Sequence, residues 1–209
     1  RPLSLRVWDV ADGAEIATLE AGADYFNPLF GPDSSRLLLS SLSPSSSWQT
    51  TLWDVERGAE LARAYGSAQW SADGARVLVT SDEGAVLWDA ADGRTLHTWP
   101  QARVARWGLD DTVVAGSTAG GDILLWDTAT GAQRPALPGH TLRQTDGYAF
   151  RFQWSADHGR ILTGDAINML RVWDAASGAL LDEFPSPFGG YTLLELDPTG
   201  GRVLIRSDN

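Results

Sequence analysis

Cysteine and lysine are both absent from this sequence of 209 residues, which has one methionine and three histidines. Without cysteine, the chain has no disulfide framework and no thiolate metal site. Its apolar runs are far shorter than the roughly 18 residues that a membrane-spanning helix needs, so we expect no membrane partner. Because all 16 basic residues are arginine, we expect a bacterial source with a GC-rich genome.

Acidic residues outnumber basic ones by 27 to 16, which gives a formal net charge of -11. A surface of this sign repels nucleic acid and anionic membranes, so we expect neither as a partner. Aspartate is favoured at turns because its carboxylate accepts hydrogen bonds from nearby backbone N–H groups. Many of the aspartates lie in turn-like stretches, and we therefore attribute the acidity to turn formation rather than to a basic ligand.

One short pattern recurs along the chain: an apolar run that ends in Trp-Asp, with a glycine four residues after the aspartate. The successive tryptophans of this pattern are 45, 35, 38 and 47 residues apart. A period of about 40 residues indicates a repeat architecture. The pairs are Trp8 and Asp9, Trp53 and Asp54, Trp88 and Asp89, Trp126 and Asp127, and Trp173 and Asp174. The glycines close turns that favour a positive φ, and they are Gly13, Gly58, Gly93, Gly131 and Gly178.

A second turn signal occurs once per repeat, such as SADG at 71–74, upstream of Trp88, and DPTGG at 197–201, near the end of the sequence. Two hairpins per repeat predict four strands, and no stretch shows a sustained helical period, so we expect an all-β fold. The strand that ends in Trp-Asp is apolar on both alternating faces, which is typical of a sheet covered on both sides. A ring of such sheets is a β-propeller made of four-stranded antiparallel blades, with tryptophan rings as core between the blades.

These features resemble the WD-repeat family in the Trp-Asp pairs, the SADG and DPTGG turns, and Gly139 followed by His140. In that family a histidine before the first strand, a Ser or Thr on the second, an aspartate in the next turn and the tryptophan form a structural hydrogen-bond relay. His140, Thr163 and Trp173 are the best matching set, with Ile167 where the aspartate is expected. The resemblance covers essentially the whole chain.

The resemblance implies a single propeller domain or segment of five WD repeats over residues 1–209. The blades are expected at about 25–64, 66–99, 102–137 and 147–184, with a split blade formed by 191–209 plus 1–20. Two architectures remain open: a ring of five blades closed by the split blade, or an arc of a larger propeller. Because the chain starts at Arg1 and stops within a repeat, we favour the arc, and a fragment of a longer chain.

Two connections on the same side of the predicted blades are long and differ from those of the other repeats: residues 40–49 and 138–148. Loops on a rigid scaffold often carry binding residues, and exposed Trp, Tyr or Arg side chains are frequent interface anchors. The candidate partner-binding residues are Trp48, Arg143, Gln144 and Tyr148. The alternative is that Trp48 packs back over its blade and the serine-rich stretch before it is a tolerated insertion.

The search for a catalytic or metal site is negative. No histidine has metal-ligand spacing to a second ligand, and there is no phosphate-binding glycine loop. We therefore expect no catalytic residue, metal or cofactor. The predicted function is a non-catalytic scaffold for protein or peptide binding, the interaction module of a larger cytoplasmic signalling or regulatory protein with a linked effector domain. The alternative is a propeller hydrolase or redox enzyme whose active site is completed by residues outside this sequence.

Overall fold

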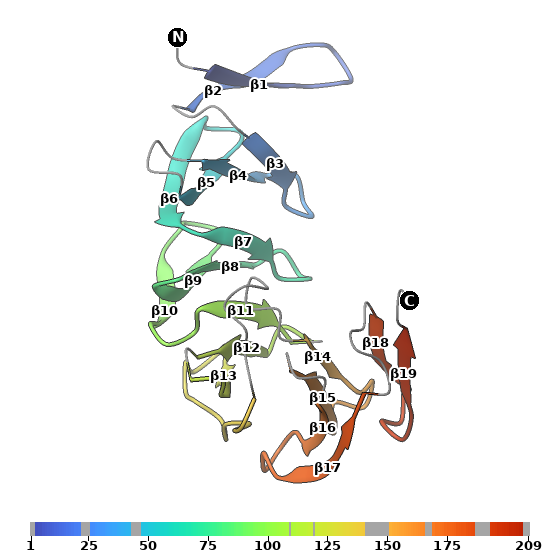
Figure 1. Ribbon diagram of the computed structural model, residues 1–209. Helices are drawn as coiled ribbons and strands as arrows, with labels where there is room; N and C mark the ends of the chain where they lie inside the picture. Colours follow the sequence, from blue (N-terminus) through green and yellow to red (C-terminus); the bar gives the residue numbers. More distant parts are fainter. Residues whose placement is uncertain are drawn as a thin grey trace. The chain divides into compact units, whose positions relative to one another are not determined.

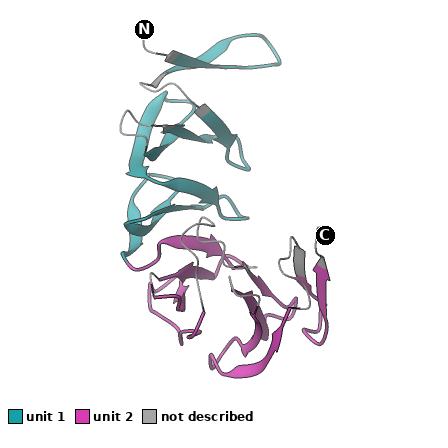
Figure 2. Cartoon of the chain, in the orientation of Figure 1, with its two compact units in different colours: residues 1–100 teal, residues 101–209 magenta. Residues whose placement is uncertain are grey.

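The computed structural model describes residues 3–21, 26–42, 47–108, 110–118, 120–140, 151–165, 169–186 and 193–206. Within these residues the regular elements are all strands, which form small antiparallel sheets that follow one another along the chain (Figure 1). The all-β prediction is therefore confirmed. The chain divides into two compact units, residues 1–100 and residues 101–209 (Figure 2).

Unit 1 contains a two-stranded sheet followed by two four-stranded sheets. Each four-stranded sheet is a meander, in which every strand pairs with the next strand in the chain. The first sheet is β1 (Leu3–Trp8) with β2 (Glu15–Ala21). The second is β3 (Phe26–Phe30), β4 (Arg36–Leu42), β5 (Trp48–Asp54) and β6 (Ala59–Tyr65). The third is β7 (Ser67–Trp70), β8 (Arg76–Ser81), β9 (Gly84–Asp89) and β10 (Thr95–Trp99).

Unit 2 repeats the same meander with sheets of three, four and two strands. Its first sheet is β11 (Val104–Trp107), β12 (Val113–Ser117) and β13 (Ile123–Asp127), extended by isolated bridges from Ile123 to Leu137 and from Trp126 to Gln133. Its second is β14 (Arg151–Trp154), β15 (Arg160–Gly164), β16 (Met169–Asp174) and β17 (Leu180–Pro185). Its third is β18 (Leu193–Leu196) with β19 (Val203–Arg206).

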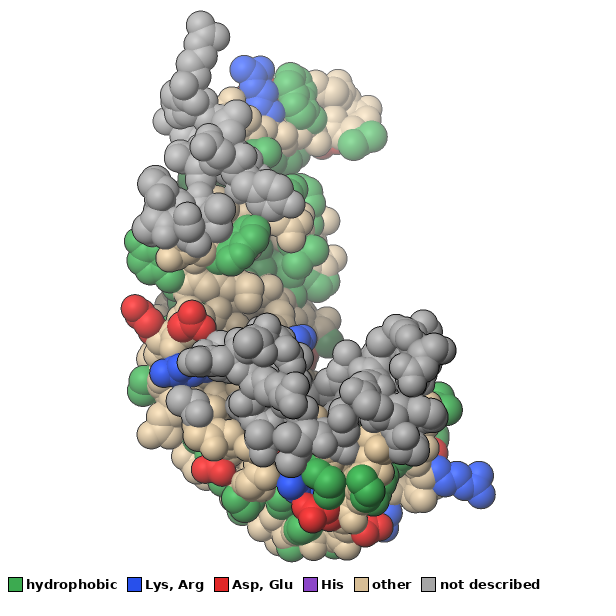
Figure 3. Space-filling model, viewed as in Figure 1, with side chains coloured by type: hydrophobic (Ala, Val, Ile, Leu, Met, Phe, Trp, Pro, Cys, Tyr) green, Lys and Arg blue, Asp and Glu red, His purple; other side chains and the backbone are tan. Residues whose placement is uncertain are grey.

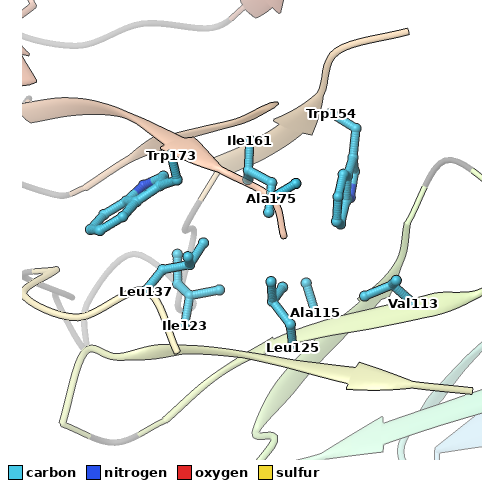
Figure 4. Packing of buried hydrophobic residues seen from close by; sticks show 9 residues of the cluster. All are labelled: Val113, Ala115, Ile123, Leu125, Leu137, Trp154, Ile161, Trp173 and Ala175. Atoms are coloured by element: carbon cyan, nitrogen blue, oxygen red, sulfur yellow. The ribbon is translucent and has the colours of Figure 1, made fainter. Parts of the chain in front are cut away.

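Apolar side chains fill the space between successive sheets of a unit. In unit 2, side chains of the β11–β13 sheet face those of the β14–β17 sheet (Figure 4). This cluster consists of Val113, Ala115, Ile123, Leu125, Leu137, Trp154, Ile161, Trp173 and Ala175. In unit 1, Leu37 and Trp53 pack on one face of their sheet while Leu38 and Leu52 pack on the other. The sheet is thus covered on both faces, as its continuous apolar strands predict.

Three of the tryptophans before the recurring aspartate, Trp53, Trp88 and Trp173, pack toward the sheet that precedes theirs within the same unit. Trp53 packs with Leu5, Val7 and Leu19 of the β1–β2 sheet, and Trp88 packs with residues of the β3–β6 sheet. Trp53, Trp88, Trp126 and Trp173 are all buried. Trp8 corrects the prediction that every such ring is core, because its side chain is 51% exposed. Its own sheet is the first of unit 1, and Leu5 and Val7 already contact the second sheet.

The aspartates of both turn types hold the backbone of their own turns. In the turns before the second strand of a sheet, the N–H two residues after the aspartate donates to its carboxylate, as for Asp33, Asp73, Asp110 and Asp157. The hydroxyl of Ser71 and the N–H of Ala75 lower the pKa of Asp73. In the Trp-Asp turns, the N–H and then the hydroxyl of Thr130, followed by Arg134, lower the pKa of Asp127 to about 2. These contacts show that the aspartates of both patterns lie in turns and bond the turn backbone, as the sequence predicts.

The five recurring glycines have positive φ, which confirms the turn prediction. The φ values are 74° for Gly13, 58° for Gly58, 76° for Gly93, 72° for Gly131 and 70° for Gly178. The surroundings of these turns differ. A β-carbon at Gly93 would lie 2.5 Å from the carbonyl oxygen of Leu61, whereas one at Gly13 would have no atom within 4 Å.

We expect Gly93→Ala to destabilise the protein by more than Gly13→Ala does. At Gly13 only the backbone conformation opposes alanine, at about 1 kcal/mol, while at Gly93 a steric clash with the backbone of the neighbouring sheet adds to this cost. Denaturant unfolding of the two variants measures the difference. Equal losses of unfolding free energy in the two variants would show that the clash between the new β-carbon and Leu61 adds no cost.

Candidate functional site

The candidate partner-binding residues come from two parts of the chain, the start of β5 in unit 1 and the connection between β13 and β14 in unit 2. Of the four, only Trp48 belongs to the described part of the chain. Arg143, Gln144 and Tyr148 lie outside the described residues. Their connection follows His140, which is described and is anchored as set out below.

Trp48 is the first residue of β5, and its side chain is 44% exposed. The strand becomes buried two residues later, at Thr50, and stays buried to its end. The carbonyl of Trp48 accepts a hydrogen bond of 2.8 Å from the N–H of Gly66, and the hydroxyl of Thr50 donates to the carbonyl of Gly66 at 2.7 Å. These bonds hold the end of β5 against the crossing to β7. An aromatic side chain is therefore presented to solvent by a rigid strand.

Tyr65 is a second exposed aromatic residue of this sheet, and the sequence did not single it out. It is the last residue of β6 and is 57% exposed. Its register partner is Gln49, so Tyr65 shares the face of Gln49 and lies on the face opposite Trp48. The sequence places Tyr65 at the end of a strand, where an aromatic side chain can be exposed. The same position also fits a core residue, so the sequence alone did not indicate exposure.

His140, Thr163 and Trp173 are brought together by hydrogen bonds, as the family resemblance implies. The imidazole Nε2 of His140 lies 2.7 Å from the hydroxyl of Thr163, and the indole Nε1 of Trp173 donates to the same hydroxyl at 2.8 Å. All three side chains are buried, and the two rings are 5.6 Å apart between centroids. The set joins the segment before the 141–150 connection to the second and third strands of the following sheet.

The carboxylate next to this set is Asp165, which the sequence analysis missed. Its side chain is fully buried, and it accepts hydrogen bonds from the N–H of Met169 at 2.9 Å and from Arg171 at 3.0 Å. Arg171 also pairs with Glu183 at 2.6 Å. Ile167, where the aspartate was expected, lies outside the described residues. The sequence feature that could have identified Asp165 is its position directly after a strand, two residues before Ile167 in the same connection.

Burial and, to a smaller extent, the nearby Arg171 lower the pKa of His140 from 6.5 to about 4, although the carboxylates of Asp165 and Asp122 act in the opposite direction. The imidazole is therefore neutral at pH 7. Its Nδ1 is buried and has no hydrogen-bond partner among the described residues. A neutral, enclosed ring of this kind serves as a packing and hydrogen-bonding element rather than as a proton donor to a substrate.

Within the described ranges, His, Asp and Glu side chains form no group of three or more that is arranged to hold a metal ion. The same ranges contain no helix with the length and apolar character required to cross a membrane. On the face shown in Figure 3, acidic and basic side chains are scattered rather than collected into one patch. The remaining Trp-Asp residues lie at the C-terminal ends of β1, β5, β9, β13 and β16 or directly after them, whereas Trp48 lies at the N-terminal end of β5.

Comparison with known proteins adds no family assignment: no protein-family model matches the sequence, and no curated protein is detectably similar to it.

Proposed function

We propose that this chain is part of a WD-repeat β-propeller and that it acts as a non-catalytic platform for a protein or peptide partner. Two features support the architecture. Each Trp-Asp pair closes the third strand of a meander, or the corresponding strand of the first sheet, and successive sheets within a unit pack face to face. The bonded set of His140, Thr163 and Trp173 matches the relay of that family.

The observation that carries the binding proposal is the exposure of Trp48 at the end of an otherwise buried strand. Tryptophan supplies a large contact area at low entropic cost, and binding anchors are enriched in tryptophan, tyrosine and arginine. Arg143, Gln144 and Tyr148 belong to the other long connection, which the repeat pattern of the sequence assigns to the same side of the predicted blades, so we propose them as further contacts. In the larger protein, this module would present its partner to a linked effector domain in the cytoplasm.

Selection from a displayed library of random peptides tests the platform, because the library samples many candidate partners at once. We expect the wild-type chain to select peptides that share a motif, and Trp48→Ala to weaken their binding at least about tenfold. Tyr65→Ala is the matched control, since it removes an exposed aromatic side chain from the other face of the same sheet and leaves binding unchanged.

A second variant, with alanine at Arg143, Gln144 and Tyr148, tests the neighbouring connection in the same assay. Peptides that bind both variants as well as they bind the wild type would refute this surface as the platform. Circular dichroism on each variant shows whether the fold is retained.

A further inference from the structure

An arginine at the start of the second strand links neighbouring sheets in unit 1. Arg36 donates from Nε to the carbonyl of Ala90 at 2.9 Å and from Nη2 to the carbonyl of Ala91 at 2.8 Å. Both carbonyls belong to the turn that follows Trp88 and Asp89 in the next sheet. The guanidinium also lies 3.2 Å from the carboxylate of Asp54, its own register partner. One side chain thus joins two sheets through three acceptors.

In unit 2, the residue paired with the aspartate of a Trp-Asp pair is arginine in one sheet but not in another. Arg160 is the register partner of Asp174 and donates to the carbonyl of Gly200 at 2.7 Å, again across to the next sheet. In the preceding sheet the register partner of Asp127 is Val113. The side chain of valine has no hydrogen-bond donor, so this position of β12 makes no guanidinium contact with the next sheet.

A cavity of about 130 Å³ lies where the guanidinium of an arginine at 113 would reach. Its lining includes Val113 itself and Ala175 with Ala176, which follow Trp173 and Asp174 as Ala90 and Ala91 follow Trp88 and Asp89. Within the described part of the chain, no side chain donates to the carbonyls of Ala175 and Ala176. A space of this size admits several waters or a small planar cation.

The charged side chains that line the cavity are Arg134 and Asp110. Arg134 lines the cavity and lies 3.1 Å from the carboxylate of Asp127, so it replaces the contact that Arg36 makes with Asp54. Asp110 also lines the cavity; its Oδ1 accepts from the N–H and hydroxyl of Thr112, and its Oδ2 lies 3.3 Å from Nδ1 of His158. Since Asp127 pairs with Arg134, Asp110 is the lining carboxylate without an arginine partner among the described residues, and its Oδ2 can accept from an entering cation.

The cavity also has an aromatic wall with an unused donor. Trp154 is 9% exposed, and its indole Nε1 is buried without a hydrogen-bond partner among the described residues. The equivalent Trp70 in unit 1 does have one, since its Nε1 donates to the carbonyl of Leu29. Indole faces attract guanidinium groups, and the Nε1–H of Trp154 is a built-in reporter at the cavity wall.

We propose that this cavity is a binding site for the guanidinium group of an arginine side chain supplied by a peptide or protein ligand. The two alanine carbonyls and Asp110 accept from its planar donors, and Trp154 packs against it. The rigid fork of a guanidinium matches such separated acceptors better than the point charge of a lysine. The site contains none of the residues proposed for the platform, so it stands whether or not the platform does.

The test is a titration of the isotope-labelled chain with N-acetyl-arginine amide, followed through the indole Nε1–H resonance of Trp154. We expect a saturable shift, with N-acetyl-lysine amide binding at least about tenfold more weakly. Asp110→Asn keeps the oxygen that holds the turn and should weaken arginine binding by about tenfold, because a hydrogen bond to a charged group is lost.

Val113→Arg should fill the cavity from within. We expect this variant to show a displaced Trp154 resonance without ligand and no further response to N-acetyl-arginine amide, while Val113→Met, which adds volume without a donor, still responds. A wild-type chain that gives no saturable shift, or that responds equally to the lysine amide, overturns the proposal. If Val113→Arg does not fold, Asp110→Asn decides, and unchanged arginine binding in that variant overturns the proposal as well.

Discussion

Replacing Trp173 by alanine is expected to lower the free energy of unfolding by about 3–5 kcal/mol, the range for removal of a fully buried aromatic ring. Trp173 is 2% exposed and packs with Ile161, Leu125 and Leu137 between two sheets. The change also removes the N–H that bonds Thr163 in the interior, which leaves the hydroxyl with one partner fewer. Denaturant unfolding followed by circular dichroism measures the loss.

Trp8→Ala is the matched control, because Trp8 precedes an aspartate in the same pattern but is 51% exposed. We expect it to cost about 1 kcal/mol or less, as is usual for a surface position. Comparing the two variants separates the effect of burial on stability from the effect of belonging to the Trp-Asp pattern. Similar losses at both positions would contradict the assignment of Trp173 to the core and of Trp8 to the surface.

The second large effect is a loss of stability in mild acid that depends on His140. Its folded pKa of about 4 lies below the ordinary value of 6.5, so the native state binds fewer protons than the unfolded state between these values. The contribution of neutral His140 to the free energy of unfolding is therefore fully present above pH 6.5 and is lost as the pH falls through about 4. Between about pH 7 and about pH 4.5 we expect a fall of roughly 2–3 kcal/mol in the free energy of unfolding.

His140→Gln isolates this effect, since glutamine retains a hydrogen-bonding group for Thr163 but does not titrate. We expect the stability of this variant to change little over the same pH range. Four turn aspartates, Asp33, Asp73, Asp127 and Asp157, have pKa values lowered from 3.8, so their contribution to stability disappears only at more acidic pH, with Asp127 titrating at about 2. An unchanged slope in the variant would mean that another group causes the acid sensitivity.

Much of the fold follows from local rules that the sequence displays. The recurring glycines have positive φ because only the turn decides their backbone, and the strand that ends in Trp-Asp is buried on both faces because its residues are apolar on both. Trp8 could not be predicted in this way. Its pattern is the same as that of Trp53, but burial also needs a neighbouring sheet on the correct side, which is a property of the assembled unit.

In the candidate site, too, some residues were predictable from the sequence and others depend on the folded structure. His140, Thr163 and Trp173 were recognisable because each has a fixed place in the repeat. Asp165 was missed because the position of a carboxylate in a turn depends on the path of the backbone, and here Arg171 and the N–H of Met169 hold it. The cavity beside Val113 becomes visible only through strand register, which shows that Val113 occupies the place of Arg36.

The packing of Trp53, Trp88 and Trp173 against the sheet before theirs gives each unit a direction. Loss of a sheet on the N-terminal side uncovers a large aromatic surface on its successor, whereas loss of a sheet on the C-terminal side leaves that ring sheltered. In an array where each member depends mainly on its nearest neighbours, such an asymmetry makes disorder spread more readily toward the C-terminus than toward the N-terminus. Proteolytic trimming of a unit is therefore tolerated unequally at its two sides.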